Sequence, residues 1–323
     1  MPLSDLPVAL VTSTAIAVGL CFGSFLNVVI HRLPRGMNLA YPPSACPGCG
    51  TPIRALHNVP VLGWLWLRGR AACCGVRISP RYPLVEALGG LLAWALVVTR
   101  ILPFASEVGV GMAVAWFATW LALGLGLVAL AFIDLEFMIL PDSLTLGGAA
   151  LGLASSLYRA DIDWQGSLLG GVFGFGLVWL PFIWGHRKLR GFDGMGLGDA
   201  KLLLLAGCWF GVLGAAFVLF AGAIQGTLAT LVTLLVHGEI KEPAAVTAER
   251  EELARAIEEA EGEEREELVR LRDEDPLGHE APQGLAGARI PFGPFLALAC
   301  LEFALFEGHV REALSLWTDG VFG

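Results

Sequence analysis

The chain has 323 residues, of which 55% are hydrophobic and 16% are charged, and its mean hydropathy is +0.67. A soluble domain carries about 25% charged residues, so this composition predicts an integral membrane protein. The 21 basic and 30 acidic residues give a formal charge of −9, which excludes a strongly basic nucleic-acid binder. Seven cysteines in so apolar a chain do not suit a disulfide-stapled secreted domain.

Apolar stretches in chain order predict the membrane topology. Stretches of about 20 apolar residues, long enough to cross a bilayer as a helix, lie at 8–30, 83–104, 109–133, 143–158, 166–185 and 290–308. The run from 202 to 236 is too long for one span, and Gly211 and Gly214 mark a turn that divides it into two short helices. The sequence therefore predicts an all-α polytopic membrane protein with about eight transmembrane helices. The first segment lacks the basic start of a cleavable signal peptide, so we expect it to be retained.

The charges orient these spans. No Asp or Glu occurs between residues 6 and 85, whereas seven arginines follow the first span: Arg32, Arg35, Arg54, Arg68, Arg70, Arg77 and Arg81. The positive-inside rule places this loop in the cytoplasm, together with the loops at 134–142, 186–200 and 238–289. Both termini then lie outside the cytoplasm. The expected parts are a first transmembrane helix (1–30), a cytoplasmic cysteine loop domain (31–82), a transmembrane core (83–237), an acidic cytoplasmic helical insertion (238–289), and a last transmembrane helix with a C-terminal tail (290–323).

Two carboxylates at the edges of spans are the strongest chemical signal. Asp134 ends the third span in FIDLEF, and Asp199 begins the sixth in GLGDAK. Two carboxyls that meet in a low dielectric cannot both ionise cheaply, and an acid and a base around one water are suited to peptide hydrolysis. Each Asp is also a candidate helix N-cap, and Asp142 fits that role better. A proton-coupled transporter using the same carboxylates is an alternative function.

Several motifs together resemble a known family. GMGLGDAKLL is similar to the GxGD motif of polytopic aspartic proteases, and IDLEFMILPD, GSFLNVVIHRLP, RYPLVEAL and IPFGPFLALA occur with it in the order of the bacterial type IV prepilin peptidase family. The resemblance implies that Asp134 and Asp199 are the catalytic pair and Asp142 a supporting position. It also implies a location in the bacterial cytoplasmic (inner) membrane, in contact with the lipid bilayer, and prepilin or pseudopilin substrates from type IV pilus or type II secretion systems. The intact Asp pair argues against an assembly factor without protease activity.

Four cysteines in the loop domain indicate a metal site. Cys46 and Cys49 form a CxxC turn, and Cys73 and Cys74 follow in the same loop, so four thiolates can hold one structural zinc ion. The family that the chain resembles usually has CxxC twice, which would place its second pair at positions 71 and 74, but position 71 is Ala71. Cys73 is then the expected substitute. A reduced loop without metal and a disulfide remain alternatives, although the cytosol disfavours the disulfide.

A second reaction is implied by the resemblance alone. In that family the cytoplasmic loop is linked to N-methylation of the cleaved pilin by S-adenosylmethionine, and Gly69 matches a position associated with it. No nucleotide-binding GxGxxG motif after a strand supports this independently. Gly69 is equally well explained as a turn glycine.

The acidic insertion departs from the family, in which this connection is usually short. Residues 238–288 hold 16 acidic and six basic residues, and the chain outside them and Arg289 holds 14 of each. Apolar positions from Thr247 to Leu271 predict a helix. It is either a solvated helix or hairpin, or a docking surface for a basic partner or for the arginine-rich loop 31–81.

Overall fold

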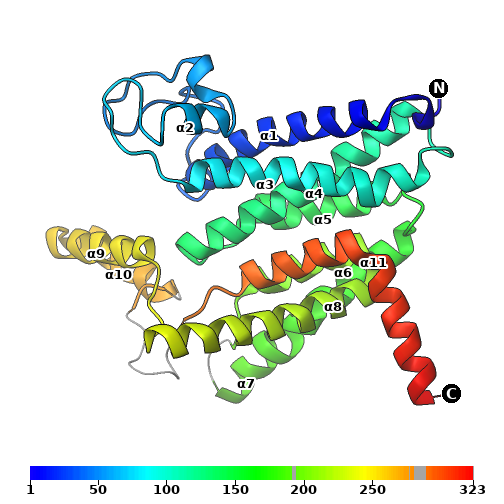
Figure 1. Cartoon of the computed structure of the whole chain (residues 1–323). Helices are drawn as coiled ribbons and strands as arrows, with labels where there is room; N and C mark the ends of the chain where they lie inside the picture. The colour runs from blue at the N-terminus through cyan, green and yellow to red at the C-terminus, as the bar shows by residue number, and fades with distance from the viewer. Residues whose placement is uncertain (191–193, 276, 280–288, 323) are drawn as a thin grey trace.

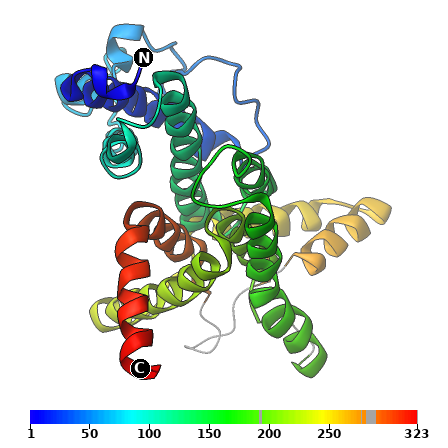
Figure 2. The ribbon, with the colours of Figure 1, turned by 90° about the vertical axis from the view of Figure 1, so that its right-hand side faces the viewer.

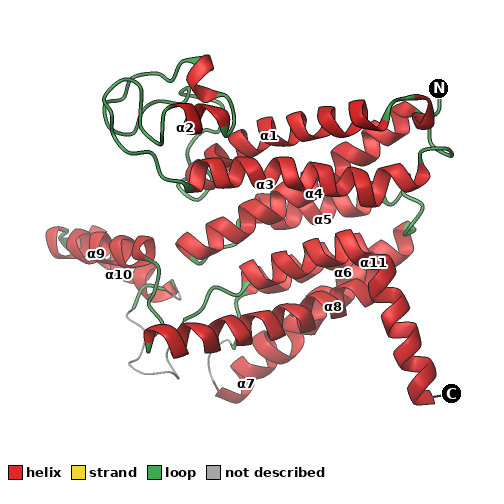
Figure 3. Ribbon diagram, in the orientation of Figure 1, coloured by secondary structure: helices red, strands yellow, loops and turns green. Residues whose placement is uncertain are grey.

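The computed structural model describes residues 1–190, 194–275, 277–279 and 289–322, and within these residues it forms helices and isolated β-bridges but no strand (Figure 3). The longer helices are α1 (Val8–Arg32), α3 (Arg81–Leu96), α4 (Val110–Phe137), α5 (Asp142–Ser155), α6 (Trp164–Val178), α8 (Leu197–His237), α9 (Ala244–Glu259), α10 (Gly262–Glu274) and α11 (Gly293–Phe322). Two short helices, α2 (Leu62–Trp66) and α7 (His186–Arg190), and the π-helical continuations Val97–Ile101 and Trp179–Gly185 complete the main elements. The all-helical prediction is confirmed.

Six of the described helices are long and apolar enough to cross a membrane, so the protein is a multi-pass membrane protein. They begin at Val8, Arg81, Val110, Trp164, Leu197 and Gly293. The predicted count of eight is not confirmed. The segment expected at 143–158 forms α5, which has only 14 residues. The two helices expected within 202–236 are the two arms of α8, which meet at Gly211.

The chain reverses inside α8. Gly211 has φ +71° and ψ −168°, which is not helical. A Cβ added to Gly174 of α6 would lie 2.1 Å from the carbonyl oxygen of Leu203 and 3.2 Å from Cβ of Ala215. In a straight helix these two residues would be about 18 Å apart, so the arms before and after Gly211 lie side by side. The predicted turn is therefore present at Gly211, whereas Gly214 lies in the helix after it.

The helices form a bundle with two distinct ends (Figure 1). The cysteine loop domain lies at one end, here named the loop end, together with the end of α4 and the start of α11. The chain termini lie at the opposite, terminal end. The view turned by 90° shows α1 and α3 on one side and α8 and α11 on the other, with α4 between them (Figure 2). Leu127, Leu130 and Ile133 of α4 are completely buried, so this helix forms the centre of the core.

Glycines allow two helix pairs to pack closely. A Cβ on Gly19 of α1 would lie 2.3 Å from the carbonyl oxygen of Gly89 in α3, and a Cβ on Gly207 of α8 would lie 1.9 Å from that of Gly170 in α6. Small residues at such crossings let backbones approach in the absence of a hydrophobic force between membrane helices. These contacts fix α1 to α3 and the first arm of α8 to α6.

The acidic insertion contains two helices, as in the hairpin alternative, and not one continuous helix from Thr247 to Leu271. Helix α9 ends at Glu259, and α10 begins at Gly262, which has φ +59°. The buried side chains of α9 are those of Val246 and Ile257. Most of the insertion is therefore a solvated pair of helices that extends beyond the bundle at the loop end (Figure 1).

Candidate active site and cysteine cluster

Asp134 lies near the end of α4 at the loop end of the bundle. The helix ends at Phe137, because Met138 adopts a left-handed conformation with φ +56° and closes the last turn onto the Asp134 carbonyl. The Asp134 side chain is only 5% exposed. Its Oδ2 accepts a hydrogen bond of 2.9 Å from the backbone N–H of Gly293, the first residue of α11. This bond orients the carboxyl.

Asp199 is the third residue of α8 and is also buried. Gly196 is the N-cap of this helix, and the Asp199 N–H donates to the Gly196 carbonyl. Asp199 is therefore not the N-cap, which was the structural alternative for this residue. Its first turn lies at the loop end because α8 runs from there toward Gly211.

The two carboxyls converge beside Leu140. A Cβ on Gly198 would lie 3.0 Å from Leu140 Cβ, and a Cβ on Gly293 would lie 2.9 Å from Leu140 Cδ2 and 2.8 Å from Asp134 Oδ2. Gly198 directly precedes Asp199, and Gly293 donates to Asp134, so Leu140 lies between the backbone of α8 and the start of α11. Leu140 thus contacts both the residue before Asp199 and the residue that donates to Asp134, which places the two acids at one site.

Asp142 lies apart from this pair in its interactions. Pro141 is the N-cap of α5, so Asp142 is the first helical residue and makes no capping bond. Its Oδ1 accepts 2.6 Å from Lys201 Nζ. The N-cap interpretation of Asp142 is therefore wrong. The ion pair instead joins α5 to the first turn of α8, two residues after Asp199.

Glu136 is a polar residue at this end that sequence reasoning missed. Arg81 donates to its Oε2 at 2.6 Å, and Arg35 lies 3.8 Å from its Oε1. These pairs link the two ends of the cysteine loop domain to the last turn of α4. The signal was present in the sequence, since Glu136 follows Asp134 by two residues inside the IDLEFMILPD motif. Gly293, in the IPFG motif, was missed as the hydrogen-bond donor for Asp134.

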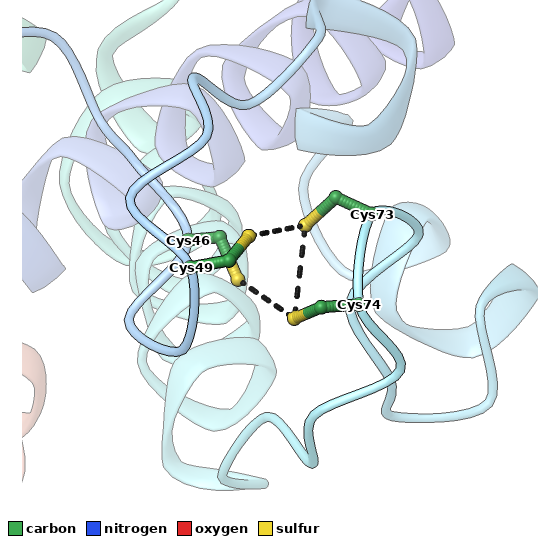
Figure 4. Close-up of side chains that lie close together, drawn as sticks. All are labelled: Cys46, Cys49, Cys73 and Cys74. Carbon is green, nitrogen blue, oxygen red and sulfur yellow. Dashed lines mark hydrogen bonds between the residues drawn. The ribbon is translucent and has the colours of Figure 1, made fainter.

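The structure brings together all four cysteines of the loop domain (Figure 4). Their sulfur atoms lie within 4.8 Å of one another. Cys46 Sγ lies 3.6 Å from Cys74 Sγ, and Cys49 Sγ lies 3.3 Å from Cys73 Sγ. All four are free thiols, so the disulfide alternative does not apply here. In a tetrahedral site with Zn–S bonds of about 2.3 Å, sulfurs are about 3.8 Å apart, and this cluster fits such a site.

The four cysteines lie on two turns that have the same pattern of backbone hydrogen bonds. In the first, the Cys46 N–H donates to the Thr51 carbonyl and the Gly50 N–H to the Cys46 carbonyl, both at 2.9 Å. In the second, the Ala71 N–H donates to the Val76 carbonyl at 2.9 Å, and the Gly75 N–H to the Ala71 carbonyl at 2.8 Å. Ala71 therefore occupies the position of Cys46. Cys73, two residues later, supplies the sulfur that position 71 lacks.

The thiols of this cluster have unequal proton affinities. A hydrogen bond with the Thr51 hydroxyl lowers the pKa of Cys49 to about 6. Hydrogen bonding to the Cys49 sulfur raises the pKa of Cys73 to about 12. Four thiols in one place compete for protons, and a divalent cation would remove that competition by stabilising the thiolates.

Gly69 lies in a tight turn of the same domain. It has φ +71°, and a Cβ there would lie 2.9 Å from Cζ2 of Trp64. The Trp64 indole N–H donates to the Ile78 carbonyl at 3.1 Å, and the Ile78 N–H donates to the Gly69 carbonyl at 2.8 Å. The turn explanation accounts for glycine at this position.

Comparison with known proteins gives the family. The model of the bacterial peptidase A24 N-terminal domain matches residues 17–100, and that of the type IV leader peptidase family matches residues 121–231. The chain belongs to the type IV leader peptidase family. The resemblance noted from the motifs is thereby confirmed, and neither match extends over the acidic insertion. No solved structure matches the chain.

Curated relatives of this family member are named prepilin leader peptidase/N-methyltransferase. The protein from Aeromonas hydrophila is 39% identical over 242 residues, which cover 68% of this chain and 79% of the relative. That from Dichelobacter nodosus is 36% identical, with 66% and 79% covered. That from Neisseria gonorrhoeae is 35% identical, with 69% and 82% covered. The similarity therefore extends over most of each relative.

Proposed function

We propose that this chain is a membrane-embedded aspartic endopeptidase that removes the leader peptide from type IV prepilins or pseudopilins. The observation that carries the proposal is the placement of two buried carboxyls, on α4 and α8, around Leu140 at one end of a membrane bundle. The family and the names of its relatives supply the substrate class. The arginines of the cysteine loop domain support a cytoplasmic position for this end, in the inner membrane.

Asp134 and Asp199 are the catalytic pair in this proposal. Two carboxyls around one water in a low dielectric share one proton, so one acts as the base and the other as the acid. The base takes a proton from a water molecule that attacks the scissile carbonyl, and the acid protonates the leaving amine. The Gly293 N–H holds one oxygen of Asp134, which keeps its carboxyl aligned through the reaction. The transporter alternative is not favoured, because it explains neither the family match nor the cysteine cluster.

The cysteine loop domain serves a second reaction. The relatives' names include an N-methyltransferase activity, and we extend it to this chain with S-adenosylmethionine as the methyl donor for the new N-terminus. Cys46, Cys49, Cys73 and Cys74 would hold a structural zinc ion, which would crosslink a domain with little apolar core of its own. Arg81 and Glu136 connect this domain to the α4 turn that follows Asp134.

The test is cleavage of a purified prepilin by the purified full chain in detergent. Asp134→Ala and Asp199→Ala are each expected to abolish leader removal. Asp163→Asn is the matched control, because Asp163 caps α6 at the terminal end by accepting from the Gly166 N–H, and Asn caps equally well. Processing retained in either Ala variant would remove that residue from the pair, and no processing by the unmodified protein would refute the proposal.

A further inference from the structure

Glu242, between α8 and α9, is the centre of a half-buried ion network at the base of the acidic insertion. Its Oε2 accepts 2.6 Å from Arg250 of α9, and its Oε1 lies 3.3 Å from Arg289. The three side chains are 14%, 15% and 23% exposed. Ion pairs shielded from water in this way are screened less by salt than surface pairs are.

Backbone carbonyls complete the network. Arg250 Nε donates to the Leu277 carbonyl at 3.1 Å, and Arg289 donates to the His279 carbonyl at 2.9 Å. Glu242, Arg250 and Arg289 therefore join three parts of the insertion: its start, the segment after α10, and the residue at which it ends.

Arg289 begins a short connection to the candidate active site. Residues 289–293, here named the strap, lead directly to the Gly293 N–H that donates to Asp134 Oδ2 at 2.9 Å. The strap is in close contact with Asp134 at that point, because a Cβ on Gly293 would lie 2.8 Å from Asp134 Oδ2. Only four peptide bonds separate Arg289, which pairs with Glu242, from the Gly293 amide that donates to Asp134.

The base of the insertion also touches α4 next to Asp134. Residues 243–245 and the α4 side chains Phe132, Leu135 and Glu136 line one surface hollow. The insertion thus contacts α4 on one side and the strap on the other. Helix α4 carries Asp134, and the strap donates a hydrogen bond to its carboxyl.

We propose that Glu242 and Arg289 are positioning residues, through which the acidic insertion holds the strap and thereby the Asp134 carboxyl. This inference rests on the proposed peptidase activity, and it gives the insertion, which the family models do not cover, a role in that activity. The role belongs to the base of the insertion rather than to its exposed acidic helices.

The experiment compares Glu242→Gln, Arg289→Met and Arg289→Lys in the purified full chain with a prepilin substrate. Glu242→Gln and Arg289→Met should each lower kcat about 10-fold with KM changed less than about 2-fold, because small misplacements of catalytic groups act on the transition state. Arg289→Lys keeps the charge and should remain within about 3-fold of the unmodified kcat. The double variant should be no slower than the slower single variant, because both changes break one network.

Glu239→Gln is the matched control. Glu239 also pairs with a basic residue, Lys241 at 2.9 Å, but both side chains are more than half exposed. Its kcat should equal that of the unmodified protein. A kcat loss of the same size in this control, or a raised KM with unchanged kcat in Glu242→Gln, would overturn the proposal.

Hydrogen exchange separates this inference from the proposed activity. A peptide covering residues 289–298 should exchange faster in Glu242→Gln than in the unmodified protein, whether or not a prepilin is cleaved. Unchanged exchange would refute the positioning role. Inactive unmodified protein with faster exchange in the variant would refute the peptidase proposal alone.

Discussion

Gly293 determines where the Asp134 carboxyl lies. A methyl group on its Cα would lie 2.8 Å from Asp134 Oδ2 and 2.9 Å from Leu140 Cδ2, so Gly293→Ala must displace the carboxyl. We expect kcat for prepilin cleavage to fall about 100-fold, the effect of misplacing a catalytic group by about 1 Å. Gly147→Ala is the control, because a Cβ at that α5 position meets open space. Initial rates near the unmodified value in Gly293→Ala would contradict this role.

Gly69 is expected to matter through the fold of its turn. Any side chain at its φ of +71° is strained by about 1 to 2 kcal/mol, and a Cβ would in addition press on the Trp64 ring at 2.9 Å. Gly69→Ala should therefore make the cysteine loop domain more susceptible to limited proteolysis. Gly36→Ala carries similar strain, with φ +64°, but its Cβ meets no neighbour. Equal protease sensitivity of the two variants would show that the Trp64 contact adds nothing.

The sequence predicted which residues belong to the candidate site more successfully than it predicted the residues that they contact. Asp134 and Asp199 stand out because a carboxylate in an apolar run is costly, and that argument needs no structure. Asp142 was interpreted as an N-cap, yet Pro141 takes that position and Asp142 pairs with Lys201, 59 residues away. The bond from Gly293 to Asp134 spans 159 residues. No local pattern encodes such distant partners.

In the second cysteine turn, we expect that a zinc ligand can be moved from position 73 to position 71. Because Ala71 has the backbone bonds of Cys46, the double variant Ala71→Cys/Cys73→Ala should restore the ordinary CxxC pair and bind one zinc per chain. Cys73→Ala alone should bind zinc at least about 10-fold more weakly, since one of four ligands is lost. Elemental analysis after dialysis against a weak chelator measures both. Cys21→Ala, outside the cluster, is the control, and zinc-free unmodified protein would refute the metal site.

Helix boundaries were predicted where a backbone signal was strong. Gly211 was expected to turn the chain and does so, because only glycine readily adopts its φ and ψ. The position of the break between α9 and α10 was not predicted, since charged residues at helical spacing continue through Ala260 and Gly262 and conceal it. The short α5 was overestimated because apolar residues continue past Ser155 into the loop that follows.

In the whole molecule, the two most strongly charged regions have opposite signs, and both lie at the loop end: the arginine-rich loop domain and the acidic insertion. The arginine-rich loop domain carries no acid, and two of its arginines, Arg35 and Arg81, pair with Glu136. Among the described residues, the ion pairs of the acidic insertion stay within it or join it to Arg289. The docking of one on the other, which was one alternative from the sequence, is not supported by these pairs. The basic loop domain and the acidic insertion are therefore attached to the bundle separately.

The reversal at Gly211 gives a testable topology. A straight α8 of 41 residues would be about 61 Å long, twice the hydrocarbon thickness of a bilayer. Instead, Trp209 binds Arg159 through its carbonyl at the terminal end, and Gly238 ends α8 at the loop end. A membrane-impermeant maleimide should therefore label Val212→Cys in intact cells but Gly238→Cys only after permeabilisation. The unmodified chain measures background labelling from its own cysteines. Labelling of both variants from the same side would mean that the second arm of α8 does not cross the membrane.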